Sequence, residues 1–147
     1  MNKLKSVKNI IRLSAVALLV VAFGCMFFNQ VIVTNQGKLN FIESYFSNHG
    51  SFIPLIGYVL LFLTAFGITI TVFFNQYEEK RIVFILCAII ILISSIIIFM
   101  EGALITIRIN TEGVSARLLT APIVAGSLSI LASLGICFAE FIPDIKL

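Results

Sequence analysis

The chain has 147 residues, of which 60% are hydrophobic and 12% are charged, and its formal net charge is +3. A soluble domain carries about 25% charged residues, so this composition excludes an ordinary soluble globular protein, and the small net charge excludes an electrostatic nucleic-acid binder. We therefore predict an all-α integral membrane protein, whose first partner is the lipid bilayer.

Four stretches are long and apolar enough to cross a hydrocarbon core about 30 Å thick as helices. The predicted spans of this single four-helix domain are residues 11–28, 52–74, 82–100 and 121–141. They are separated by an outer loop (29–51), an inner turn (75–81) and a second outer loop (101–120), and a tail follows (142–147). Arg12 and Glu140 lie near span ends, where we expect their side chains to reach water.

Basic residues predict the orientation of these spans. The ends predicted to be cytoplasmic carry Lys3, Lys5, Lys8, Arg12, Lys80, Arg81 and Lys146. The opposite side carries only Lys38, Arg108 and Arg117, spread over two longer loops. We therefore expect both termini in the cytoplasm. The frequent use of Ile, Phe, Asn and Lys is typical of an AT-rich genome, which favours the cytoplasmic membrane of a bacterium.

Cys25 lies near the end of the first span, in a context that superficially resembles a lipidated signal peptide. Such a site needs a branched aliphatic residue three positions before the cysteine and a small residue two positions before it. Ala22 and Phe23 fit this pattern poorly, so we expect the span to be retained. Cys25, Cys87 and Cys137 all fall inside predicted spans, and we expect them to pack as small apolar residues without forming disulfides.

The first outer loop predicts a short strand and a short helix. Residues 31–33 are β-branched and are followed by a turn at 35–37. Asn40 and Glu43 have the spacing of a capping box, which predicts a helix beginning at Phe41. The apolar side chains Phe41, Ile42, Tyr45 and Phe46 would share one face of this helix, which we expect to lie in the membrane interface.

The second outer loop alternates apolar and polar residues over 105–109, turns at 110–113 and continues through 114–118. This pattern predicts a β-hairpin. An isolated hairpin is marginally stable in water, so we expect it to pair with the strand of the first loop in a small sheet. Two interpretations of this sheet remain open, a recognition surface and a structural cap over the helices.

The second and fourth spans share a weak repeat at a shift of 68 residues, which aligns Pro54 with Pro122. The same shift matches Leu60 to Leu128, Leu63 to Leu131, Gly67 to Gly135 and Ile68 to Ile136. One interpretation is a duplicated two-helix hairpin, whose halves are parallel repeats about an axis along the membrane normal. The other interpretation is chance similarity between two helices rich in Leu and Ile.

Small residues recur at every fourth position of the last span, at Ala121, Ala125, Ser129, Ser133 and Cys137. Lipid provides no hydrophobic drive for helix association, so close packing of small residues must provide it. Further predicted packing residues are Gly57, Gly67 and Gly135. We expect the fourth span to be the central packing element, and much of the isoleucine-rich third span to face lipid.

Four hydroxyl groups inside the spans belong to Thr64, Thr71, Ser129 and Ser133. Such groups usually bond to carbonyls of their own helix, and lining a polar path is the alternative interpretation. The sequence has no HExxH motif, no paired intramembrane aspartates, no Ser–Lys dyad within a span and no glycine-rich phosphate loop. His49 is the single histidine, and we expect Glu101 and Glu140, at opposite membrane ends, to be hydrated.

We accordingly predict no catalytic, cofactor-binding or metal-binding residues. The leading hypothesis is a non-catalytic accessory subunit, scaffold or envelope component that acts through its outer loops and helix surfaces. Its partners would be other membrane proteins or further copies of itself. The alternative is a small oligomeric transporter or channel.

Overall fold

The computed structural model describes residues 6–34, 37–47, 50–74, 80–109 and 115–143. Within these ranges four helical segments are long and apolar enough to cross a membrane. They comprise α1 (Val7–Gly24) with the 3₁₀ turn η2 (Cys25–Phe27), α3 (Ile53–Phe73), α4 (Lys80–Phe99) continued by α5 (Glu101–Ile109), and α6 (Thr120–Phe141). The third segment is therefore longer than predicted, because helix continues beyond residue 100.

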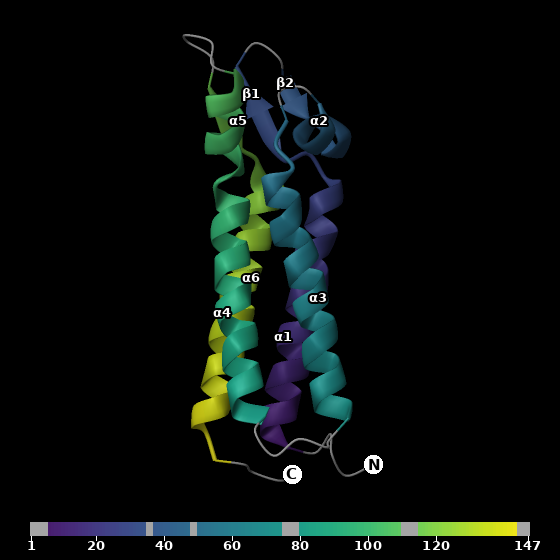
Figure 1. Ribbon diagram of the computed structural model, residues 1–147, viewed down its shortest axis with the longest axis vertical. Coiled ribbons are helices and arrows are strands. Elements are labelled where there is room, and N and C mark those ends of the chain that lie inside the picture. Colours follow the sequence, from purple (N-terminus) through teal and green to yellow (C-terminus); the bar gives the residue numbers. More distant parts are fainter. Residues whose placement is uncertain (1–5, 35–36, 48–49, 75–79, 110–114, 144–147) are drawn as a thin grey trace.

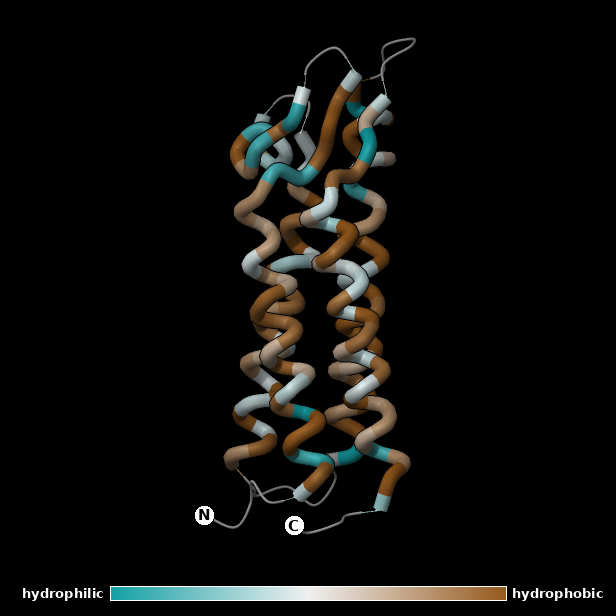
Figure 2. Tube along the Cα trace, turned by 180° about the vertical axis from the view of Figure 1, so that it is seen from behind, coloured by the Kyte–Doolittle hydropathy of each residue, from teal (hydrophilic) through white to brown (hydrophobic). Residues whose placement is uncertain are grey.

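The four long helices form a ring in which α1 packs against α3 and α6, and α4 packs against the same two neighbours. The two most extensive of these interfaces are those of α6 with α4 and α1, which agrees with the fourth span as the main packing element, although α6 occupies one corner of the ring. Figure 1 shows α1 beginning and α6 ending at one end of the bundle, here called the terminal end. The strands, α2 and α5 lie at the sheet end. Hydrophobic residues dominate the long helices between these ends (Figure 2).

The predicted repeat corresponds to a repeated pattern of burial. The buried residues of α3 are Pro54, Gly57, Tyr58, Leu61, Thr64, Ala65, Ile68 and Val72. Each has a buried counterpart in α6 at the shift of 68, namely Pro122, Ala125, Gly126, Ser129, Ala132, Ser133, Ile136 and Glu140. The two helices thus present equivalent faces to the core from opposite corners of the ring. That this pattern arose by duplication remains a prediction.

A three-stranded sheet lies at the sheet end, formed by β1 (Val31–Val33), β2 (Gly37–Leu39) and β3 (Ala116–Leu118) in the order β2-β1-β3. Both pairings are antiparallel, and Ile32 is opposite Lys38 on one side and Arg117 on the other. The predicted pairing between the two loops is therefore confirmed. Gly37 has a φ of +88°, a backbone conformation that favours glycine.

The predicted strand at 105–109 was wrong, because these residues form the second half of α5. An alternation of only five residues does not distinguish a strand from a helix with one buried face, and here the helical face contains Gly102 and Ile105. Thr106 donates to the carbonyl of Gly102 at 2.9 Å and accepts from the amide of Ala116 at 2.8 Å. Its hydroxyl therefore links α5 to β3. The turn predicted at 110–113 lies outside the described residues.

The short helix α2 (Phe41–Phe46) begins with the predicted capping box. The Glu43 amide donates to the Asn40 side chain at 3.0 Å, and the Asn40 amide donates to the Glu43 carboxylate at 3.0 Å. The expected single apolar face was wrong, since Tyr45 is buried against the bundle while Ile42 and Phe46 are exposed. Phe41 is half-buried.

Gly50 connects α2 to α3 at a close backbone approach, and a methyl group there would lie 2.6 Å from the carbonyl oxygens of both Glu43 and Ser44. We expect Gly50→Ala to lower the free energy of unfolding by about 1–3 kcal/mol, because backbone must move to accommodate it. Thermal unfolding in detergent micelles measures this change. Gly24→Ala is the matched control, since nothing lies within 4 Å of its added methyl group. Equal stability of both variants would contradict the prediction.

Candidate functional site

The predicted small-residue stripe of α6 faces the core for most of its length. Ala125, Ser129 and Ser133 are buried, while Ala121 and Cys137 are half-buried. The third span is one-sided as well, with a buried face that includes Phe84, Ile91 and Ile98 and an exposed face that includes Ile89, Ile93 and Ile96.

The three predicted packing glycines differ in their surroundings. A methyl group on Gly57 would lie 3.0 Å from the Ser94 carbonyl oxygen, so α3 and α4 approach closely there. Gly67 has open space, and the nearest atom to a methyl group on Gly135 is 3.8 Å away. Gly126 is the tighter position in α6, because the ring of Phe99 occupies the space where its side chain would be.

The four hydroxyls of the predicted polar path are all hydrogen-bonded to backbone. Thr64, Thr71 and Ser129 donate to carbonyls of their own helices, at 2.7, 2.8 and 2.7 Å. Ser133 donates across the helix interface to the Ala88 carbonyl of α4 at 3.0 Å. These contacts use the one proton that each hydroxyl carries, and they provide a packing role for each group.

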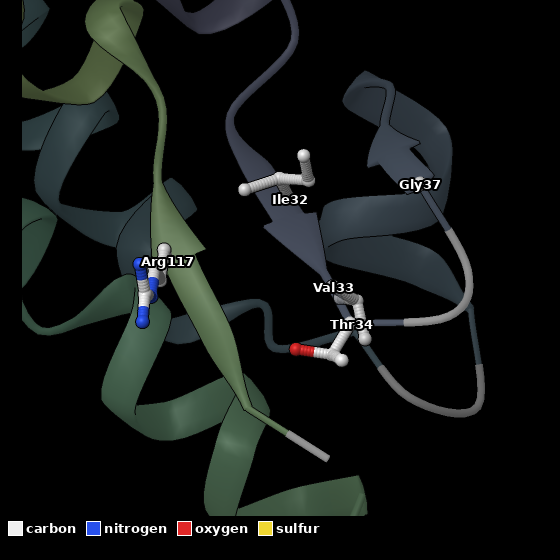
Figure 3. Close-up of a pocket in the computed structure, with 5 residues that line it drawn as sticks. All are labelled: Ile32, Val33, Thr34, Gly37 and Arg117. Atoms are coloured by element: carbon white, nitrogen blue, oxygen red, sulfur yellow. The ribbon is translucent and has the colours of Figure 1, made fainter.

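The outward face of the sheet carries a row of three side chains that sequence reasoning did not identify. Ile32 projects from the central strand, and its cross-strand neighbours are Lys38 and Arg117. All three are exposed. Beside the row, an open pocket of about 400 Å³ is lined by Ile32, Val33, Thr34, Gly37 and Arg117 (Figure 3). We call Lys38, Ile32 and Arg117 the basic row.

The opposite face of the sheet is apolar and packs onto α5. Val31, Val33, Leu39 and Ile105 form a buried cluster separate from the core of the helix bundle. Alternation along β1 therefore divides an inward apolar face from an outward basic one, as expected for a half-buried strand. The packing of the inward face onto α5 holds in place the strands that carry the basic row.

A buried polar cluster lies beneath the sheet, where η2, α2, α3 and α5 meet. The Tyr58 hydroxyl donates to Oε1 of Gln30 at 2.9 Å, and Nε2 of Gln30 donates to the Cys25 and Met26 carbonyls at 2.8 and 3.0 Å. The Tyr45 and Tyr58 rings meet edge to face, with centroids 6.5 Å apart. Burial raises the pKa of Tyr45, and the nearby Glu101 carboxyl raises it further, so its hydroxyl stays protonated.

Glu101 belongs to this cluster, and the expectation that it is hydrated was wrong. It is the first residue of α5 and is 0% exposed. Both of its carboxyl oxygens and the Tyr45 hydroxyl are buried and form no hydrogen bond of standard geometry, but the Tyr45 hydroxyl lies within hydrogen-bonding reach of the Glu101 carboxyl. No other buried side-chain nitrogen or oxygen in the described part of the chain lacks a partner.

A buried ion pair lies at the terminal end, where hydrated side chains were expected. Nε of Arg12 in α1 donates to Oε1 of Glu140 in α6 at 3.1 Å, and Nη2 donates to the same oxygen at 2.5 Å. The two side chains are only 10% and 3% exposed. The guanidinium also donates to Asn9 at 3.0 Å and lies 3.8 Å from the ring centroid of Phe84. The pair therefore links α1, α6 and α4.

One sequence signal for this pair was available, since Arg12 and Glu140 are opposite charges inside predicted spans at the same end. Within the described ranges no group of three or more His, Cys, Asp or Glu residues is placed to hold a metal ion, and His49 lies outside these ranges. Comparison with known proteins found no matching family model, no matching curated protein and no matching solved structure.

Proposed function

We propose that this protein is a non-catalytic accessory or scaffold subunit of a bacterial cytoplasmic membrane, which docks a partner membrane protein through the basic row. The observation that carries the proposal is the cross-strand arrangement of Lys38, Ile32 and Arg117, all exposed on a sheet that is anchored from behind. An apolar side chain between two cations is complementary to an acidic segment that contains an apolar residue. We therefore propose that the partner contacts the basic row through such a segment.

The distribution of basic residues supports an orientation in which the sheet end is outside the cytoplasm. Most Lys and Arg residues precede the first span, lie between the second and third spans, or follow the fourth. The helix ends that adjoin these positions, the start of α1, the end of α3, the start of α4 and the end of α6, lie at the terminal end. The basic row would then face a partner in the extracytoplasmic space.

Photo-crosslinking in cells tests this proposal. A photoreactive residue at Thr34, which is exposed beside the basic row, is expected to capture a defined protein. Arg117→Glu and Lys38→Glu should each reduce the yield roughly tenfold, which corresponds to about 1.4 kcal/mol of binding free energy. Arg108→Glu is the matched control, because Arg108 is exposed at the same end in α5 but lies outside the row.

Two results would contradict the docking proposal. Crosslinks to lipid only would make the basic row a membrane-surface contact. A protein crosslink that falls equally in Arg108→Glu and Arg117→Glu would indicate a general charge effect. The remaining result, loss restricted to the row, supports docking.

A small oligomeric transporter or channel is the second candidate, and the buried carboxyl of Glu101 favours it. Ionisable groups inside membrane-spanning helices often mark ion pathways, and Glu101 lies in the segment formed by α4 and α5. Solute-dependent flux in proteoliposomes that is lost in Glu101→Gln would favour transport. Flux equal to that of protein-free liposomes would contradict transport and would favour the accessory role.

A further inference from the structure

The two outer edges of the sheet differ in what lies beside them. The outer edge of β3 is covered by α5, since the Ala116 amide donates to the Thr106 hydroxyl at 2.8 Å and a methyl group on Gly102 would lie 3.3 Å from the Ala116 carbonyl oxygen. β2 is the edge strand on the other side of β1 (Figure 3). Within the described ranges no strand pairs with the outer edge of β2.

The register of the sheet places the Lys38 backbone on this outer edge. Opposed residues of antiparallel strands alternate between pairs that exchange hydrogen bonds and pairs that do not. The Thr34 amide donates to the Ser115 carbonyl at 3.0 Å, so Ile32, two residues earlier in β1, also faces β3. Lys38 is opposite Ile32 on the other side, and its amide and carbonyl are therefore directed away from β1. The adjacent Leu39 carbonyl faces β1, where it accepts from the residue before that strand at 3.2 Å.

The charge on this edge restricts what pairs with it. Lys38 is exposed, and a lysine on an edge strand opposes pairing with a like strand, because like charges directly opposite one another are destabilising. A strand that places an acidic residue opposite Lys38 gains a favourable cross-strand pair. The edge therefore disfavours a second copy of β2 and favours an extended acidic segment.

We propose that the acidic segment of the partner binds as a fourth strand along the outer edge of β2. Its backbone bonds to the amide and carbonyl of Lys38, and one of its acidic side chains lies opposite the Lys38 ammonium group. Strand addition takes its affinity from main-chain hydrogen bonds and its specificity from alternate side chains. This inference rests on the docking function proposed above and specifies how the partner is bound.

Two substitutions at Lys38 test strand addition in the photo-crosslinking assay at Thr34. Lys38→Ala removes the charge and keeps the backbone amide, whereas Lys38→Pro removes both. Proline is tolerated in an edge strand where its nitrogen faces outward, and equal Tm values of the two variants in detergent verify that the sheet is retained. We expect Lys38→Pro to lower the crosslink yield roughly fivefold or more below that of Lys38→Ala.

The outcomes of this assay separate the docking function from the mode of binding. Absence of any protein crosslink in the native chain would contradict both. A protein crosslink that falls in Lys38→Ala and falls no further in Lys38→Pro would support docking through side chains and would overturn strand addition.

Amide hydrogen exchange of the purified full chain in detergent provides a second readout that needs no substitution. A peptide of alternating glutamate and valine is the probe, and a peptide of alternating lysine and valine is the matched control. At high occupancy the acidic peptide should slow exchange of the Lys38 amide roughly tenfold, whereas the Ile32 amide, already bonded within the sheet, should not change. Unchanged exchange at Lys38 with the acidic peptide, or equal slowing by both peptides, would overturn the proposal.

Discussion

Glu140→Ala is expected to lower the free energy of unfolding by roughly 3–5 kcal/mol, because it leaves a guanidinium buried without its anion. The Arg12 side chain is 10% exposed, so water offers little compensation. Its remaining contacts, with Asn9 and the ring of Phe84, are neutral. Denaturation in detergent micelles, followed by circular dichroism, measures the loss.

The double variant Arg12→Met/Glu140→Leu separates the cost of an orphaned charge from the value of the ion pair. Replacing both partners by apolar side chains removes the buried charge, so we expect the double variant to be more stable than Glu140→Ala. A mutant cycle built from both single variants and the double variant gives the coupling energy. A Glu140→Ala protein within about 0.5 kcal/mol of the native stability would show that the pair is solvated, contrary to its burial.

Ser129→Leu is expected to destabilise the bundle by about 1–3 kcal/mol or more, because the added side chain overfills the core. Ser129 is 0% exposed and donates to the Ala125 carbonyl at 2.7 Å. Its counterpart in α3 at the shift of 68 is Leu61, which is also fully buried. Corresponding positions of the two helices thus contribute one small and one large side chain.

Ser127→Leu is the matched control, since Ser127 is exposed on the same helix only two residues away. The two variants have the same composition and the same change in hydropathy. We expect Ser127→Leu to keep native thermal stability in detergent and Ser129→Leu to lose it. Equal stability of the two variants would show that α6 does not pack through this stripe.

The long helices were predictable because span length and hydropathy are properties of a continuous segment. The capping box at Asn40 and Glu43 was predictable for the same local reason. The strand predicted at residues 105–109 failed because its period-two pattern is short, and because the helix that begins upstream continues through it. The sequence pattern also predicted a strand over residues 114–118, and residues 116–118 form β3, which pairs with β1.

The polar sites were not predictable from local pattern, because their members are distant in sequence. Arg12 and Glu140 are 128 positions apart, and Gln30 meets Tyr58 across 28 positions. Their burial depends on how the four helices are arranged around the ring. Hydropathy placed Glu101 at a span end, where exposure is the usual outcome, and it carried no information about the α2 helix that covers this end.

The pairing of β1 with β3 has a consequence for the order of events during synthesis. Val31 is paired with Leu118, so the β1–β2 hairpin emerges from the ribosome long before its third strand. Until then β1 has an edge without hydrogen-bond partners, which is a site for wrong pairing or proteolysis. Closure of the sheet therefore requires that α4 and α5 have already been synthesised and that the chain has turned back toward the start of α6.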